Sequence, residues 1–244
     1  MVHSYHRALF EELKNRLAAD VTVDEIELLL GEHDRQCVQT ATVLGSAMGL
    51  SHQCVDATIG FAMAPKSKQG NQAICGLAGD GAMVFGMLDG TRHVITCGYR
   101  NHCPWFMSFL QSPKHVDTFV ENERSRREVI RFTIGPDGLA SPLSRELVQI
   151  ERSSGRLSKY WQLEMMPQKD LKFIALLTDG YEQISKIGSE SHKRRDVLGS
   201  QVIAGTTKFN NVFGDFVSRT CKPFFEDGNA HNFDDFTVCA LGIR

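Results

Sequence analysis

Long hydrophobic runs are missing from this chain of 244 residues. No apolar stretch approaches the roughly 18 residues that a membrane-spanning helix requires, and residues 1–6 contain no apolar signal-peptide core. An excess of charge of one sign is missing too, because 27 basic and 29 acidic residues give a formal net charge of −2. That balance does not favour binding to nucleic acid or to an anionic membrane. The sequence therefore predicts a cytoplasmic protein whose partners are neither nucleic acids nor membranes.

Patterned cysteine is also missing. The seven cysteines are odd in number and include no pair spaced as CxxC, so we expect neither a disulfide framework nor a zinc knuckle. No internal repeat, low-complexity segment or proline-rich linker divides the chain. Since 42% of the residues are hydrophobic, a sizeable core is expected. We therefore predict one domain that spans residues 1–244.

Two helices are predicted at the front of the chain. Residues 7–18 carry leucine and phenylalanine at the spacing of an amphipathic helix. The second helix is predicted over residues 22–30, because Thr22 and Glu25 form a capping-box pattern and Gly31 is typical of a helix end.

Short strands and turns are predicted further along. The small, β-branched residues 40–48 indicate a strand that is buried on both faces. Residues 151–170 are compatible with a helix or with a connecting segment. The pattern predicts further strands at 73–78, 82–88, 92–97, 128–134, 171–177 and 236–241, and a helix at 209–217.

Acidic residues follow or precede three of these strands. Asp80 and Asp179 each come at the end of a hydrophobic run, and Asp234 and Asp235 come just before the last one. Carboxylates that converge from separate strands repel each other unless a cation neutralises them, and oxygen ligands suit Mg²⁺ or Mn²⁺ better than Zn²⁺. The alternative is that each Asp serves only as a turn or helix-cap residue.

Two short stretches near the C-terminus carry a more specific pattern. Residues 176–180 read Leu-Leu-Thr-Asp-Gly, and residues 234–238 read Asp-Asp-Phe-Thr-Val. Together they resemble the C-terminal signatures of the PP2C (PPM) family of metal-dependent protein phosphatases. Upstream, residues 40–44 resemble the threonine-rich strand of that family, residues 77–82 resemble its Gly-Asp-Gly or Gly-Asp-Ser element, and residues 122–123 resemble a further, shorter element.

The resemblance implies a fold, a site and a reaction. The fold would be α+β, a PP2C-like antiparallel β-sandwich flanked by helices. Asp179 and Asp234 would ligate a catalytic pair of Mn²⁺ or Mg²⁺ ions, Asp80 would join an additional ion, and Asp235 would be an adjacent supporting ligand. Metal-activated water would hydrolyse phosphoserine or phosphothreonine in a phosphoprotein substrate, and a Ser/Thr kinase would be the expected partner.

The chain also departs from the family pattern. No DGxGG element, whose Asp bridges both metals, and no phosphate-binding Arg element precede Thr40, so these N-terminal strands are expected at or before Met1. The alternative function is therefore a catalytically impaired PP2C-like pseudophosphatase that acts as a binding or regulatory module. A third alternative is an unrelated protein in which the Asp-Gly pairs are only turns.

Four further features have a functional and a structural interpretation. His33 is a replacement metal ligand or a solvated residue at a helix exit. His231 is a proton donor to a leaving alkoxide or a loop residue. The basic run 124–127 receives a phosphorylated peptide or is a solvated charge cluster. Cys103 has no recognisable basic partner, so we do not expect a nucleophilic cysteine.

Overall fold

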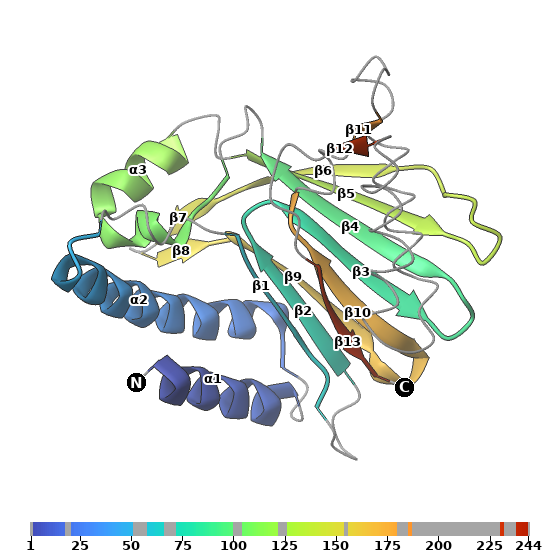
Figure 1. The fold of residues 1–244 in the computed structure, drawn as a ribbon, viewed down its shortest axis with the longest axis horizontal. Helices are drawn as coiled ribbons and strands as arrows, with labels where there is room; N and C mark the ends of the chain where they lie inside the picture. The colour runs from blue at the N-terminus through green and yellow to red at the C-terminus, as the bar shows by residue number, and fades with distance from the viewer. Residues whose placement is uncertain are drawn as a thin grey trace. The chain divides into compact units, whose positions relative to one another are not determined.

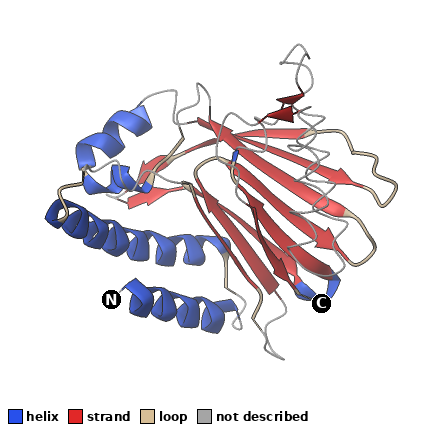
Figure 2. Cartoon of the chain, viewed as in Figure 1, coloured by secondary structure: helices blue, strands red, loops and turns tan. Residues whose placement is uncertain are grey.

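The computed structural model describes residues 2–17, 21–50, 58–65, 72–99, 104–121, 126–153, 156–179, 185–186, 230–231 and 238–243. Over these residues the chain forms helices and antiparallel β-sheets (Figures 1 and 2), which confirms the α+β class. The helices are α1 (Val2–Leu17), α2 (Val23–Ala47) and α3 (Pro113–Glu121), with short 3₁₀ segments η3 (Met107–Gln111) and η5 (Gln168–Asp170).

The strands come in four sheets. The larger two have the strand orders β1-β2-β9 and β13-β10-β3-β4-β5-β6, and β7-β8 and β11-β12 are two-stranded. Their bounds are β1 (Ile59–Met63), β2 (Gln72–Ala78), β3 (Gly81–Met87), β4 (Arg92–Tyr99), β5 (Arg126–Ile134), β6 (Ser144–Gln149), β7 (Glu151–Ser153), β8 (Arg156–Ser158), β9 (Trp161–Pro167), β10 (Leu171–Leu177), β11 (Ser185–Lys186), β12 (Ala230–His231) and β13 (Val238–Gly242).

The chain groups into two compact units that interleave along the sequence. The first unit comprises Met1–Asp80, Cys97–Val129 and Arg145–Lys169, and the second comprises Gly81–Thr96, Ile130–Ser144 and Asp170–Arg244. Because each unit takes three segments of the chain, no single position in the sequence separates them. That residues 1–244 form one domain stays a prediction.

Helix α2 begins where the sequence predicts but ends much later. The Thr22 side chain accepts a hydrogen bond from the Glu25 backbone, and the Glu25 carboxylate accepts one from the Thr22 backbone, which is the reciprocal capping box. The predicted end at Gly31 is wrong, because the helix continues to Ala47. A Cβ at Gly31 would lie 3.3 Å from the Tyr160 hydroxyl oxygen, so glycine here allows a close approach to the helix.

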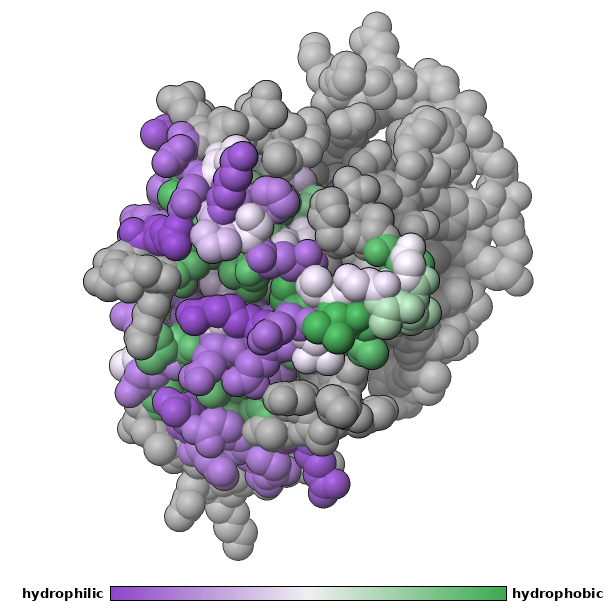
Figure 3. Space-filling model, turned by 90° about the vertical axis from the view of Figure 1, so that its left-hand side faces the viewer, coloured by the Kyte–Doolittle hydropathy of each residue, from purple (hydrophilic) through white to green (hydrophobic). Residues whose placement is uncertain are grey.

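The predicted buried strand at residues 40–48 is also wrong, because residues 40–47 form the last turns of α2. The hydroxyls of Thr40 and Thr42 donate to backbone carbonyls four residues earlier, which satisfies these side chains inside a helix. The segment is not buried either, since Val43 is 64% exposed. Figure 3, which faces the left-hand side of Figure 1, shows hydrophobic residues among hydrophilic ones on this face of the molecule.

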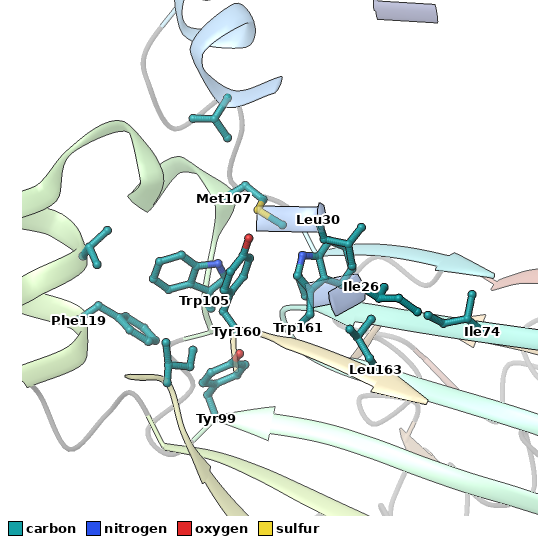
Figure 4. Close-up of a cluster of buried hydrophobic side chains, with 14 of the residues drawn as sticks. Ile26, Leu30, Ile74, Tyr99, Trp105, Met107, Phe119, Tyr160, Trp161 and Leu163 are labelled. Carbon is teal, nitrogen blue, oxygen red and sulfur yellow. The ribbon is translucent and has the colours of Figure 1, made fainter. Parts of the chain in front are cut away.

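The first unit has one core beneath its helices. Leu13 of α1 and Ile26 and Leu30 of α2 join residues of β1, β2 and β9 in a single buried cluster. Trp105 lies within the aromatic part of this cluster (Figure 4), with ring centroids 5.2 Å from Phe119 and 5.5 Å from Tyr160. Burial of these large side chains is the main stabilising contribution in this unit.

A buried carboxylate joins α2 to the segment that leads into β9. Asp34, 7% exposed, accepts hydrogen bonds on Oδ2 from the Tyr160 hydroxyl at 2.8 Å and from the Trp161 indole nitrogen at 2.7 Å. Burial, with the adjacent Asp34 charge, raises the pKa of Tyr160 well above its ordinary value. Tyr160 therefore remains a protonated donor over the physiological pH range.

The interpretation of residues 124–127 as a solvated charge cluster is wrong at Arg127, whereas Arg126 is exposed. The Arg127 side chain is 1% exposed and donates to the backbone carbonyls of Tyr160 and Trp161 at 2.9 and 3.3 Å. A third hydrogen bond reaches the Gln162 side chain at 3.1 Å.

The segment 151–170, for which a helix or a connection was expected, contains β7, β8 and β9. Arg124 and Ser125 lie outside the described residues.

The second unit has its own core. Buried residues of β3, β4, β5 and β10 form this cluster: Ala82, Val84, Val94, Ile134, Ala175 and Leu177. The predicted strands at 82–88, 92–97, 128–134 and 171–177 are thereby confirmed, with shifts of a few residues at their ends.

The predicted helix at 209–217 lies outside the described residues. Within the residues that were searched, no helix is long and apolar enough to cross a membrane.

Replacement of Asp34 tests its structural role. Asp34→Ala leaves two buried donors without an acceptor, so we expect the free energy of unfolding to fall by about 3 kcal/mol. Urea unfolding followed by circular dichroism measures the change. The control is Glu32→Ala, which removes an exposed carboxylate from the same helix and should cost less than about 0.5 kcal/mol. Equal losses for the two variants would contradict the role assigned to Asp34.

Candidate functional site

Asp80 lies in the tight turn between β2 and β3, as the sequence predicts. The flanking glycines have positive φ angles, +111° at Gly79 and +142° at Gly81, which other residues rarely adopt. The side chain of Asp80 is half-buried. Its Oδ1 accepts a hydrogen bond from the Thr58 hydroxyl at 2.9 Å.

The position of Thr58 follows from the pairing of β1 with β2. Ile59, the first residue of β1, lies opposite Ala78, the last residue of β2. Thr58 therefore lies beside Gly79, one step beyond the last pair. A Cβ at Gly79 would come within 2.6 Å of the Thr58 hydroxyl oxygen, so only glycine leaves room for Thr58 to reach Asp80.

In sequence, Asp80 and Asp179 flank the same end of the ladder that β3 and β10 form. Strands β3 and β10 are antiparallel, and Ala82 lies opposite Leu177. Asp80 comes two residues before Ala82, and Asp179 comes two residues after Leu177. The half-buried Asp179 therefore follows the end of β10 at which β3 begins.

The acidic pair Asp234 and Asp235 precedes, in sequence, a strand that begins at this end too. Leu177 also lies opposite Val238, the first residue of β13. Asp234 and Asp235 themselves lie outside the described residues, as do residues 122–123 and Cys103. His231 belongs to β12, which pairs with β11.

The structure describes two of the four proposed metal ligands, Asp80 and Asp179. Both Asp80 and Asp179 offer carboxylate oxygens, which are the ligands that Mg²⁺ and Mn²⁺ prefer. Over the described part of the chain, which excludes Asp234 and Asp235, no group of three His, Cys, Asp or Glu residues could hold a metal ion. The available donors fit a hard cation in their chemistry but do not complete its coordination.

His33 is neither solvated nor at a helix exit. It lies within α2 with a side chain that is 12% exposed, and its Nε2 is 3.5 Å from the Cys37 sulfur. Burial and the nearby Asp34 raise the pKa of the Cys37 thiol, which makes it a poor nucleophile. This pair is not near any predicted ligand in sequence, and we assign it no role.

Two polar contacts were missed by sequence reasoning, that of Thr58 with Asp80 and that of Arg127 with residues 160–162. Thr58 carries no signal by itself, because a single threonine before a short strand is common. Arg127 lies in a basic run that is typical of a surface. In both cases the partner is distant in sequence, at Asp80 or at residues 160–162.

Comparison with known proteins yields no relative. No family model, no curated protein and no solved structure matches the chain.

Replacement of Gly79 tests the packing of the turn. Gly79→Ala introduces both a strained φ and a contact with Thr58, so we expect a loss of at least about 2 kcal/mol in the free energy of unfolding. Gly138→Ala is the matched control, because its φ is +84° but nothing lies within 4 Å of its Cβ position. The control should lose about 1 kcal/mol. Urea unfolding would contradict the proposed packing if both variants lost the same amount.

Proposed function

We propose that the protein is a PP2C-like, metal-dependent phosphatase of phosphoserine and phosphothreonine in proteins. Its cofactors are two or three Mn²⁺ or Mg²⁺ ions. Asp179 and Asp234 hold the catalytic pair, Asp80 joins an additional ion, and Asp235 supports them. Its substrate is a cytoplasmic phosphoprotein, and a Ser/Thr kinase is its functional partner.

The observation that carries the proposal is the common end of three strands. Leu177 of β10 lies opposite both Ala82 of β3 and Val238 of β13. The acidic residues predicted as ligands therefore flank one end of this ladder in sequence. If each Asp served only as a turn or helix-cap residue, nothing would require all of them to flank the same end of the ladder.

The strand order also supports a PP2C-like arrangement. The proposal requires a short strand of small and β-branched residues before the Gly-Asp-Gly turn. Residues 40–47 do not supply it, since they belong to α2, but β1 precedes that turn in the chain and pairs with β2. We propose that β1, with Thr58 before it, takes that position in an antiparallel β-sandwich flanked by helices.

The residues of this chain have distinct tasks in the proposed reaction. Asp179 and Asp234 bind and orient the ions, and the end of β10 positions Asp179. Bound Mn²⁺ or Mg²⁺ supplies Lewis-acid chemistry, since it neutralises phosphate charge and lowers the pKa of water. His231, three residues before Asp234, is a candidate proton donor to the leaving serine or threonine oxygen.

A pseudophosphatase that binds a partner is the second candidate function. The favouring observation is that the described residues, which exclude Asp234 and Asp235, contain no group of three His, Cys, Asp or Glu residues that could hold a metal ion. Fewer carboxylates bind a pair of dications less tightly. Calorimetry with Mn²⁺ separates the candidates, because strong two-site binding supports the enzyme and its lack supports the binding module.

Hydrolysis of p-nitrophenyl phosphate in millimolar Mn²⁺ tests the enzyme. We expect metal-dependent turnover, and Asp179→Asn should lower kcat by at least about 100-fold because it removes a ligand of the ions. Asp170→Asn is the matched control, since Asp170 is an exposed carboxylate at the opposite end of β10. It should retain full turnover. The enzyme proposal is wrong if the protein shows no turnover or if Asp179→Asn behaves like Asp170→Asn.

A further inference from the structure

In the part of the chain that the structure describes, the partner of the Asp80 carboxylate is a neutral side chain. Across the described residues its hydrogen-bond partner is the Thr58 hydroxyl, 2.9 Å from Oδ1, and no Lys, Arg or His forms an ion pair with it. Asp80 makes no other hydrogen bond or ion pair in that part of the chain. Among the described residues, the carboxylate of Asp80 is therefore oriented by a neutral hydroxyl.

The contact is built into the backbone on both sides. Pairing of Ile59 with Ala78 sets Thr58 beside the turn. On the other side, Gly79 removes the Cβ that would come 2.6 Å from the Thr58 hydroxyl oxygen and 3.0 Å from its Cα. The Thr58–Asp80 contact therefore depends on a glycine with φ of +111°, a conformation that is unfavourable for other residues.

We propose that Thr58 is a positioning residue that fixes the Asp80 carboxylate for a divalent cation, an inference that rests on the proposed function. The Thr58 hydroxyl occupies Oδ1 and sets the plane of the carboxylate. The remaining lone pairs, chiefly those of Oδ2, stay available for the cation. Fixing the rotamer before binding reduces the conformational entropy that metal binding would otherwise cost.

Groups that hydrogen-bond to a metal ligand typically change metal affinity by about 10–100-fold. A hydroxyl suits this task because it donates one hydrogen bond without adding positive charge. A lysine or arginine in the same place would repel the cation. A threonine that served only to close the turn would have no effect on metal affinity once the protein is folded.

Calorimetric titration of the full chain with Mn²⁺ tests the role of Thr58 without reference to activity. Asp80→Asn should remove one Mn²⁺ binding step, which identifies the step that depends on Asp80. Thr58→Val, which replaces the hydroxyl with a methyl group of similar size, should weaken that step about 10-fold or more. Thr58→Ser keeps the hydroxyl and should bind Mn²⁺ within about 2-fold of the unaltered protein.

The double variant Thr58→Val/Asp80→Asn separates an effect on carboxylate positioning from an effect on folding. Thr58→Val should have no further effect on Mn²⁺ binding in the Asp80→Asn background, because the hydroxyl then has no metal ligand to position. Thermal melting by circular dichroism verifies that each variant is folded. Thr58→Ala, which adds no bulk to the turn, carries the same expectation if Thr58→Val does not fold.

The outcomes distinguish this inference from the proposed function. If the unaltered protein binds no Mn²⁺, both fail. If it binds Mn²⁺ through Asp80 but folded Thr58→Val binds equally well, the role of Thr58 is wrong while the proposed function stands. Selective weakening of the Asp80-dependent step in Thr58→Val, with recovery in Thr58→Ser, supports the inference.

Discussion

The pairing of β10 with β3 and β13 is the constraint on which the candidate site depends. Because β10 has a neighbour on both sides, its backbone hydrogen bonds fix the register of all three strands. Residues that follow β10 or precede its two neighbours then flank one end of the ladder in sequence. A shift of a single residue would turn each strand over and exchange its buried and exposed faces. The buried residues of β3 and β10, among them Val84 and Ala175, oppose such a shift.

In the first unit, hydrogen bonds to a few buried polar groups set the position of the helices. Asp34 accepts from Tyr160 and Trp161, while Arg127 donates to the carbonyls of the same two residues. A buried charge is costly unless such bonds satisfy it, so these contacts favour one arrangement of α2 against the start of β9. Lys159, with a φ of +63°, also donates its backbone N–H to Glu27 of α2.

Local sequence signals were sufficient to predict elements whose contacts join residues close together in the sequence. The capping box at Thr22 and the strand–turn–strand around Asp80 could both be predicted because each depends on neighbouring residues. The sequence 40–48 misled because small β-branched residues suit a strand, whereas continuation of α2 satisfies their backbone groups within the helix. Burial of Arg127 and the contact of Thr58 with Asp80 could not be predicted, since each needs a partner 22 or more residues away.

A crystal structure of the protein grown with Mn²⁺, with anomalous scattering measured at the manganese edge, tests the central claim most directly. The account predicts manganese at the shared end of β3, β10 and β13, with carboxylate oxygens of Asp179 and Asp234 about 2.0–2.6 Å from the metal. Carboxylates of Asp80, Asp179 and Asp234 more than about 12 Å apart, or manganese bound only elsewhere, would contradict it, because shared ligation requires contact with the same ions.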